Sequence, residues 1–215
     1  TWSDLWLQDT RLNEAKEALF RIAKDTEDTD ARVFVGLPIE KEQKLYNAAA
    51  VLKSGEILAF IPKENIPSYG EFYEARHFTP GKGLADDGIP LGTDILFACD
   101  NMEGLVVGCE ICEDVWSVDP PSTRHALAGA NVIVNLSASN DLVGKDTYRK
   151  ELVKATSARL LSAYVYASAG DGESTQDVVY SGHNIIAENG TVLSESVPFT
   201  TGILYADLDI QKLRM

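Results

Sequence analysis

Short apolar runs separated by turn-forming residues are the feature of this sequence that most constrains its fold. Each run is too short for a typical helix, is rich in Val, Ile, Leu and Ala, and is bounded by turn residues, which is the pattern of β-strands. The main runs are Arg32–Gly36, Leu45–Leu52, Ile57–Pro62, Asp94–Ala98, Leu105–Ile111, Asn131–Leu136 and Ala163–Ala167. We therefore expect a protein built on β-sheets.

Helical periodicity and hairpin turns occur between these runs. Apolar residues recur at helical spacing over Asp9–Asp25, and helical patterns over Ser122–Ala130 and Asp146–Ser162 each lead into an apolar run. Lys53–Glu56 and Asn189-Gly190 resemble hairpin turns, because such residues tolerate positive φ. Helices that alternate with strands, together with hairpins, predict an α/β fold with mixed sheets.

Composition narrows the class of protein. The chain has 215 residues, 45% of them hydrophobic, and no Pro/Gly linker divides it, so we expect a single domain over residues 1–215. Its 33 acidic and 19 basic residues would repel phosphate backbones and anionic lipid, which argues against nucleic-acid and membrane partners. With no spanning segment and no signal segment in the sequence, a cytoplasmic location is expected.

Three cysteines lie close together in the sequence, and one of them is a candidate nucleophile. Cys99, Cys109 and Cys112 do not form a secreted disulfide pattern, so reduced thiols are expected. Cys109 and Cys112 point to opposite faces of an extended strand, which disfavours a shared metal. Cys112 lies where the apolar run stops and an acidic turn begins, a place where backbone N–H groups could bind an oxyanion.

Other interpretations of the cysteines stay open on the residues alone. All three could be small buried side chains, because free cysteine is commonly buried. A Cys-His arrangement that uses Cys112, His183 and Asn184 is also compatible with the spacing, although neither partner lies in a recognisable motif.

Two ordered segments resemble the nitrilase (carbon-nitrogen hydrolase) superfamily, and within it the glutaminase domains of glutamine-dependent NAD synthetases. They are Pro62–Phe78 and Ile111–Trp116, and a third likeness covers Asn135–Asn140 and the helix start after it. The resemblance extends over nearly the whole chain. It implies an αββα sandwich with mixed sheets, of which the first strand, helix and second strand precede this sequence.

The resemblance also implies the chemistry. Cys112 matches the nucleophile, Lys63 the lysine, and Glu74 the second glutamate, which supports the lysine and the reacting centre. An ammonium near Cys112 would favour the thiolate and stabilise the oxyanion of glutamine's side-chain amide. Ammonia would leave to serve NAD synthesis from deamido-NAD, and water would hydrolyse the resulting thioester. Without the motif, Lys63 would be interpreted as a solvated lysine and Glu74 as a surface charge.

Five further residues match those that shape the glutamine pocket: Tyr69, Phe72, Glu113, Ser139 and Lys145. Plain core packing is the competing interpretation of the two aromatic residues. Lys145 stands where some relatives have an arginine that binds the substrate carboxylate, and a lysine lacks the two-pronged geometry. Arg149 could therefore take part instead.

The family's general-base glutamate lies in a Pro-Glu motif ahead of a segment similar to the start of this sequence. We therefore expect an N-terminally incomplete piece, inactive if that glutamate is absent. Gly202–Ile210 resembles the family's last strand. No cofactor or metal is expected for this domain, because ATP and Mg²⁺ belong to a synthetase domain of which nothing appears. That domain and a homo-oligomer are the expected partners. The alternatives are a free-standing amidase or nitrilase of other specificity and a non-catalytic assembly module.

Overall fold

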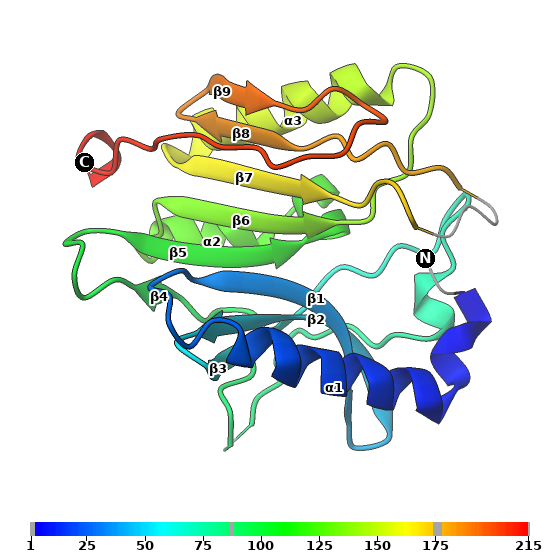
Figure 1. Cartoon of the computed structure of the whole chain (residues 1–215). Coiled ribbons are helices and arrows are strands. Elements are labelled where there is room, and N and C mark those ends of the chain that lie inside the picture. The colour runs from blue at the N-terminus through cyan, green and yellow to red at the C-terminus, as the bar shows by residue number, and fades with distance from the viewer. Residues whose placement is uncertain (1–2, 87, 174–177, 215) are drawn as a thin grey trace. The chain divides into compact units, whose positions relative to one another are not determined.

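The computed structural model describes residues 3–86, 88–173 and 178–214, which divide into two compact units between Ile95 and Leu96. Each unit contains one sheet, as the labels in Figure 1 show. The mixed α/β character expected from the sequence is confirmed. The single domain expected for residues 1–215 stays a prediction.

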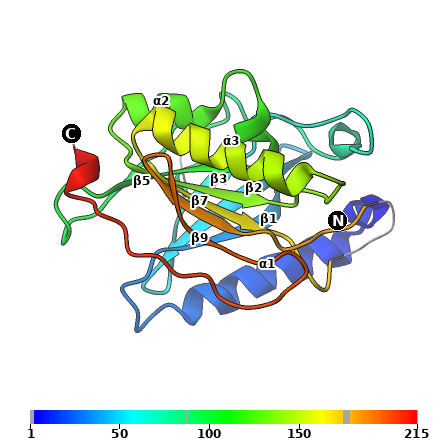
Figure 2. The same cartoon turned by 90° about the horizontal axis from the view of Figure 1, so that it is seen from above.

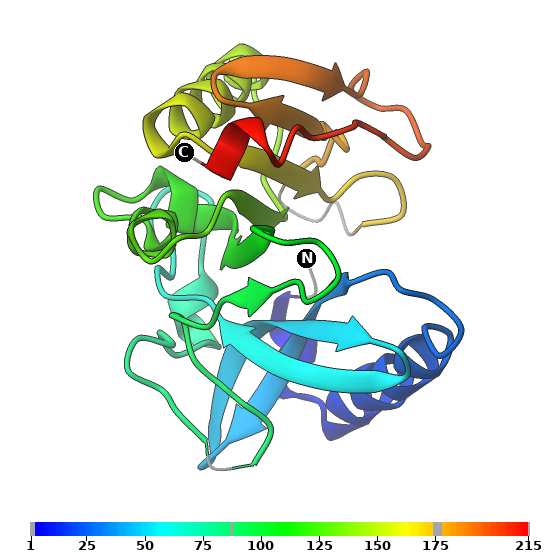
Figure 3. The same cartoon turned by 90° about the vertical axis from the view of Figure 1, so that its left-hand side faces the viewer.

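The first unit is an antiparallel sheet with one long helix against it. The strands β1 (Val33–Lys41), β2 (Lys44–Lys53) and β3 (Glu56–Pro62) lie in that order, and β2 pairs with both others. The helix α1 (Asp9–Lys24) lies beside this sheet (Figure 3), and its Leu19 and Ala23 pack with Ala50 and Leu52 of β2. Burial of this apolar stripe explains why the amphipathic segment forms a helix here. This unit also contains two short 3-10 helices, η1 (Ser3–Leu7) and η2 (Glu74–Arg76).

The second unit is a mixed sheet in the order β4-β5-β6-β7-β8-β9. Its elements are β4 (Phe97–Ala98), β5 (Val106–Ile111), η3 (Cys112–Trp116), α2 (Pro121–Leu127), β6 (Val132–Ser137), α3 (Lys145–Leu160), β7 (Ala163–Ser168), β8 (Ile185–Glu188), β9 (Thr191–Glu195) and η4 (Lys212–Arg214). Strands β5, β6 and β7 run parallel, and the remaining neighbours are antiparallel.

Two helices cover one face of this second sheet. Figure 2 shows α2 and α3 on the same side of the strands, and Val153 of α3 packs with Ile133, Tyr164 and Ile185 in the core. Because β5 and β6 are parallel neighbours, their carboxyl ends open at the same edge, where ligands commonly bind in such sheets. Within the part of the chain that the structure describes, no helix is long and apolar enough to cross a membrane.

Both hairpin turns expected from the sequence are confirmed. Ser54 and Gly55 have φ values of 50° and 84°, and Asn189 and Gly190 have 44° and 83°. Two successive positive φ values define the turn whose twist matches the flanking strands, β2–β3 in one case and β8–β9 in the other.

Three strand predictions need correction. Strand β1 runs past Gly36 to Lys41 and includes Pro38, which an edge strand tolerates because one row of its N–H groups is unpaired. The run Asp94–Ala98 forms a strand only over its last two residues. Residues 202–210 alternate in exposure but form no strand, since no described strand pairs with them. An alternating pattern marks a strand only where a partner supplies the hydrogen bonds.

The Asn189-Gly190 turn gives a stability prediction. Gly190→Ala forces a side chain into a left-handed backbone, and its Cβ would lie 3.0 Å from the Cβ of Ala158 on α3. We expect a loss of about 1–2 kcal/mol of unfolding free energy, measured by urea denaturation. Gly172→Ala is the matched control, because Gly172 has a φ of +88° but no neighbour within 4 Å of the added Cβ. An equal loss in both variants would show that the contact with Ala158 has no cost.

Candidate active site

Cys112 occupies a strained turn at the carboxyl end of β5. It is the first residue of η3, is partly buried, and has a φ of 47°. A residue with a Cβ adopts this left-handed conformation at a cost of about 1–3 kcal/mol, and such strain is concentrated at functional sites. Its backbone N–H donates to the Oδ1 of Asn135 on β6 at 3.1 Å, so this N–H is already engaged. The turn changes the direction of the backbone at the edge of the sheet where β5 and β6 both end.

Asn135 joins this turn to a buried polar chain. Its Oδ1 also accepts a hydrogen bond from Ser137 Oγ at 2.8 Å, and its Nδ2 donates to the Tyr164 hydroxyl at 3.0 Å. Tyr164 in turn donates to the Glu110 carboxyl, whose other oxygen accepts from the Ser122 N–H at 2.8 Å. Asn135, Tyr164 and Glu110 are each at most 1% exposed. A buried network of this kind is stabilising only when every member is satisfied.

Burial controls the charge state of Glu110. The pKa of its carboxyl is raised from 4.5 to about 7, because desolvation, with a smaller contribution from nearby Asp114, outweighs the hydrogen bonds from Tyr164 and Ser122. Desolvation also raises the pKa of the Tyr164 hydroxyl well above its ordinary value, with Glu110 adding to the effect. Tyr164 therefore stays protonated and remains a donor to Glu110.

The three cysteines are free, and they differ in environment. Cys109 is 1% exposed, and burial raises the pKa of its thiol well above its ordinary value, with the charges of Glu110 and Asp114 adding to the shift. A thiol held in its neutral form is a poor nucleophile. Across the described residues no group of three His, Cys, Asp or Glu side chains could hold a metal ion.

His183 does not partner Cys112. Its two ring nitrogens lie 3.0 Å from Arg149 Nη1 and 3.0 Å from Glu195 Oε1. The Cys-His arrangement that the spacing allowed is therefore not formed, because both nitrogens are engaged elsewhere.

In the first unit, the buried Lys63 forms an ion pair with the partly buried Glu74. Lys63 directly follows β3 and is 2% exposed, and its Nζ donates to Glu74 Oε2. Asn47 Nδ2 of β2 donates to the other oxygen of Glu74 at 2.6 Å. Lys63 is thus not the solvated lysine that its sequence context alone would indicate. A buried ammonium is costly unless it is paired, and here a carboxylate faces it directly.

The aromatic residues Tyr69 and Phe72 lie in the segment between Lys63 and Glu74. Their rings meet edge to face, with centroids 5.7 Å apart. Tyr69 is 59% exposed, so core packing does not account for it.

In the second unit, the predicted pocket residues lie at the carboxyl ends of β5 and β6. Glu113 follows Cys112 in η3 and is partly buried. Ser139 is 3% exposed, and its Oγ accepts from Arg149 Nη2 at 3.4 Å. The Nζ of Lys145 donates to Asn140 Oδ1 and lies 5.6 Å from the centre of the Trp116 ring.

Sequence reasoning missed the polar residues that support Cys112. Glu110, Asn135 and Tyr164 had no role assigned to them, although Glu110 and Asn135 interrupt apolar strands that are otherwise buried. A buried carboxyl or amide in such a strand needs partners, and this requirement was the available signal.

Comparison with known proteins assigns the class. The profile of the carbon-nitrogen hydrolase family matches residues 6–215, and the chain belongs to this family. Among its relatives is the glutamine-dependent NAD(+) synthetase of Mycobacterium tuberculosis, 41% identical over 219 residues, which cover 98% of this chain and 32% of that protein. The chain therefore spans about a third of the length of the curated relatives it matches.

Solved structures agree on the fold. A glutamine-dependent NAD(+) synthetase from Cytophaga hutchinsonii matches with a TM-score of 0.79 and 28% identity, covering 94% of this chain and 33% of that one. A mutant amidase of the nitrilase superfamily from Nesterenkonia AN1 matches with a TM-score of 0.77 and 19% identity, covering 100% and 75%. The nitrilase-type fold and the resemblance stated from the motifs are confirmed.

The raised pKa of Glu110 predicts a specific pH dependence. As the pH rises from 4.5 to about 7, the unfolded chain releases the Glu110 proton while the folded chain keeps it, so folding stability falls. The loss is complete above the folded pKa and amounts to roughly 3 kcal/mol, because each tenfold difference in proton affinity between the two states contributes about 1.4 kcal/mol.

Glu110→Gln removes this titration. We expect the unfolding free energy of the wild type, relative to the variant, to fall as the pH rises through this range, measured by urea denaturation at a series of pH values. The exposed Glu151→Gln on α3 is the control. Parallel pH profiles for the wild type and Glu110→Gln would contradict the assignment.

Proposed function

We propose that this chain hydrolyses the side-chain amide of glutamine, with Cys112 as nucleophile. The observation that carries the proposal is the left-handed turn of Cys112 at the carboxyl end of β5, which Asn135 holds in place. The carbon-nitrogen hydrolase match supports cleavage of a C–N bond, and the glutamine-dependent relatives support glutamine as the substrate.

The proposed reaction has two steps. The Cys112 thiolate adds to the amide carbon, the amide nitrogen takes up a proton, and the C–N bond breaks to release ammonia and leave a thioester. Water then adds to the thioester, the C–S bond breaks, and glutamate leaves with the thiol regenerated. The resemblance assigns the main proton transfer to the family's general-base glutamate.

Lys63 and Glu74 supply charge to the reaction in this proposal. The ammonium of Lys63 stabilises the oxyanion that forms on the amide oxygen, and Glu74 keeps that ammonium charged and oriented. The Asn47 contact in turn fixes the Glu74 carboxylate. Tyr69, Phe72, Glu113, Ser139 and Lys145 are proposed to bind the amino-acid part of glutamine. The ammonia would serve a synthetase domain, and homo-oligomerisation is part of the same proposal.

Glutamine hydrolysis, measured in a protein that also supplies the family's general-base glutamate, tests the nucleophile and the ion pair. Cys112→Ala should lower kcat by roughly 10³-fold or more, because the variant lacks the thiol that forms the thioester in this proposal. Glu74→Gln should lower kcat on the order of 10²-fold, since an amide cannot hold the Lys63 charge as a carboxylate does.

Glu17→Gln on α1, which removes an exposed carboxylate, is the matched control and should leave kcat unchanged. Undiminished turnover in Cys112→Ala would refute the nucleophile. A wild-type protein that hydrolyses other amides but not glutamine would refute the substrate.

A further inference from the structure

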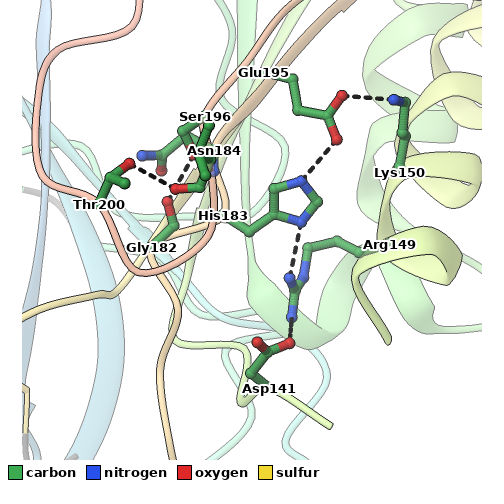
Figure 4. Close-up of polar contacts among 10 residues, drawn as sticks. Asp141, Arg149, Lys150, Gly182, His183, Asn184, Glu195, Ser196 and Thr200 are labelled. Carbon is green, nitrogen blue, oxygen red and sulfur yellow. Dashed lines mark hydrogen bonds and ion pairs between the residues drawn. The ribbon is translucent and has the colours of Figure 1, made fainter. Parts of the chain in front are cut away.

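A fully buried arginine links helix α3 to the loop that follows β6. Arg149 is 0% exposed, and its Nη2 donates to the Asn140 backbone carbonyl at 3.0 Å and to Ser139 Oγ at 3.4 Å. Asp141 Oδ1 lies 3.9 Å from the same nitrogen (Figure 4). A buried guanidinium is costly unless its donors are paired, so these contacts fix both the side chain and the loop.

The other end of Arg149 contacts a histidine whose tautomer can be assigned. A guanidinium only donates hydrogen bonds, so His183 Nδ1, 3.0 Å from Nη1, must accept. The ring proton is therefore on Nε2, which donates to Glu195 Oε1 at 3.0 Å. His183 is itself 1% exposed, so the acceptor is held in one orientation.

Glu195 is fixed from the opposite side by a lysine on α3. Lys150 Nζ donates to Glu195 Oε2 at 2.6 Å, so the chain of contacts runs from Lys150 through Glu195 and His183 to Arg149 (Figure 4), and Arg149 continues it to the Asn140 carbonyl. Partial burial raises the pKa of Glu195, but the hydrogen bonds from Lys150 and His183 outweigh it, and the net pKa lies below its ordinary value. Glu195 thus remains an acceptor for the Nε2 proton of His183.

We propose that His183 is a positioning residue that acts through Arg149 to set the loop Ser139–Asp141 for substrate binding. This inference rests on the proposed function in one respect: Ser139 is taken to bind glutamine. The loop is held from several sides, since Lys145 binds the Asn140 side chain and the Asp141 N–H donates to the Val179 carbonyl at 2.7 Å. Arg149 is the internal support of the loop, and the substrate carboxylate is left to other groups.

Two variants of His183 whose new side chains are nearly isosteric with each other test the role of Nδ1 as the acceptor for Arg149. His183→Asn can place its side-chain oxygen where Nδ1 lies, whereas His183→Leu places a methyl group there and leaves Arg149 Nη1 without its acceptor. Hydrogen exchange of the Asp141 amide reports on the loop without requiring activity.

We expect exchange at Asp141 to be roughly 10-fold faster in His183→Leu and within about 2-fold of wild type in His183→Asn. Amides of β5 and β6, measured in the same experiment, show whether the fold is kept. Wild-type exchange at Asp141 in His183→Leu, or equal acceleration in both variants, would overturn the inference.

Glutamine kinetics supply the second readout. His183→Leu should raise KM roughly 10-fold with kcat changed less than about 3-fold, and His183→Asn should restore KM. A wild type without glutamine turnover, when the general-base glutamate is present, would refute the proposed function, and the exchange result would still decide the role of His183. Wild-type turnover with an unchanged KM in His183→Leu would refute this inference alone.

Discussion

The hydrogen bond from the Cys112 backbone N–H to the Asn135 side chain is the interaction on which the candidate site depends. A non-glycine residue in the left-handed region returns to ordinary backbone angles unless its surroundings hold it there. Asn135 can do so because Ser137 and Tyr164 fix its own amide, and Tyr164 is fixed by Glu110. The orientation of the thiol is therefore set by side chains on three neighbouring strands of one sheet.

Much of the fold was predictable because local signals and tertiary pairing agree. Turn residues bounded most of the strands correctly, and the Asn-Gly hairpin formed as its φ preferences require. The strand predictions were wrong where hydrogen bonding to a neighbouring strand decides whether a strand forms. Strand β4 is short, and residues 202–210 have strand-like alternation without a described partner strand. Periodicity specifies which face is buried, but it does not specify whether a neighbouring strand is present.

The candidate site was predictable only in part, for a related reason. The motifs located Cys112, Lys63 and Glu74, and the structure brings Lys63 and Glu74 into contact. The supports of these residues are buried polar side chains far apart in sequence, such as Glu110 with Tyr164 and Arg149 with His183. Their partners are chosen by strand register and helix packing, which no local pattern encodes.

Covalent labelling tests the central claim, that Cys112 is the nucleophile of a glutamine site, most directly. The protein is treated with a glutamine analogue that carries an electrophilic ketone, and the modified cysteine is mapped by peptide mass spectrometry with and without competing glutamine. We predict an adduct on Cys112 that glutamine suppresses, with the partly exposed Cys99 as an internal reference thiol whose labelling glutamine does not change. An unmodified Cys112, or labelling of Cys112 that glutamine does not reduce, would contradict the account.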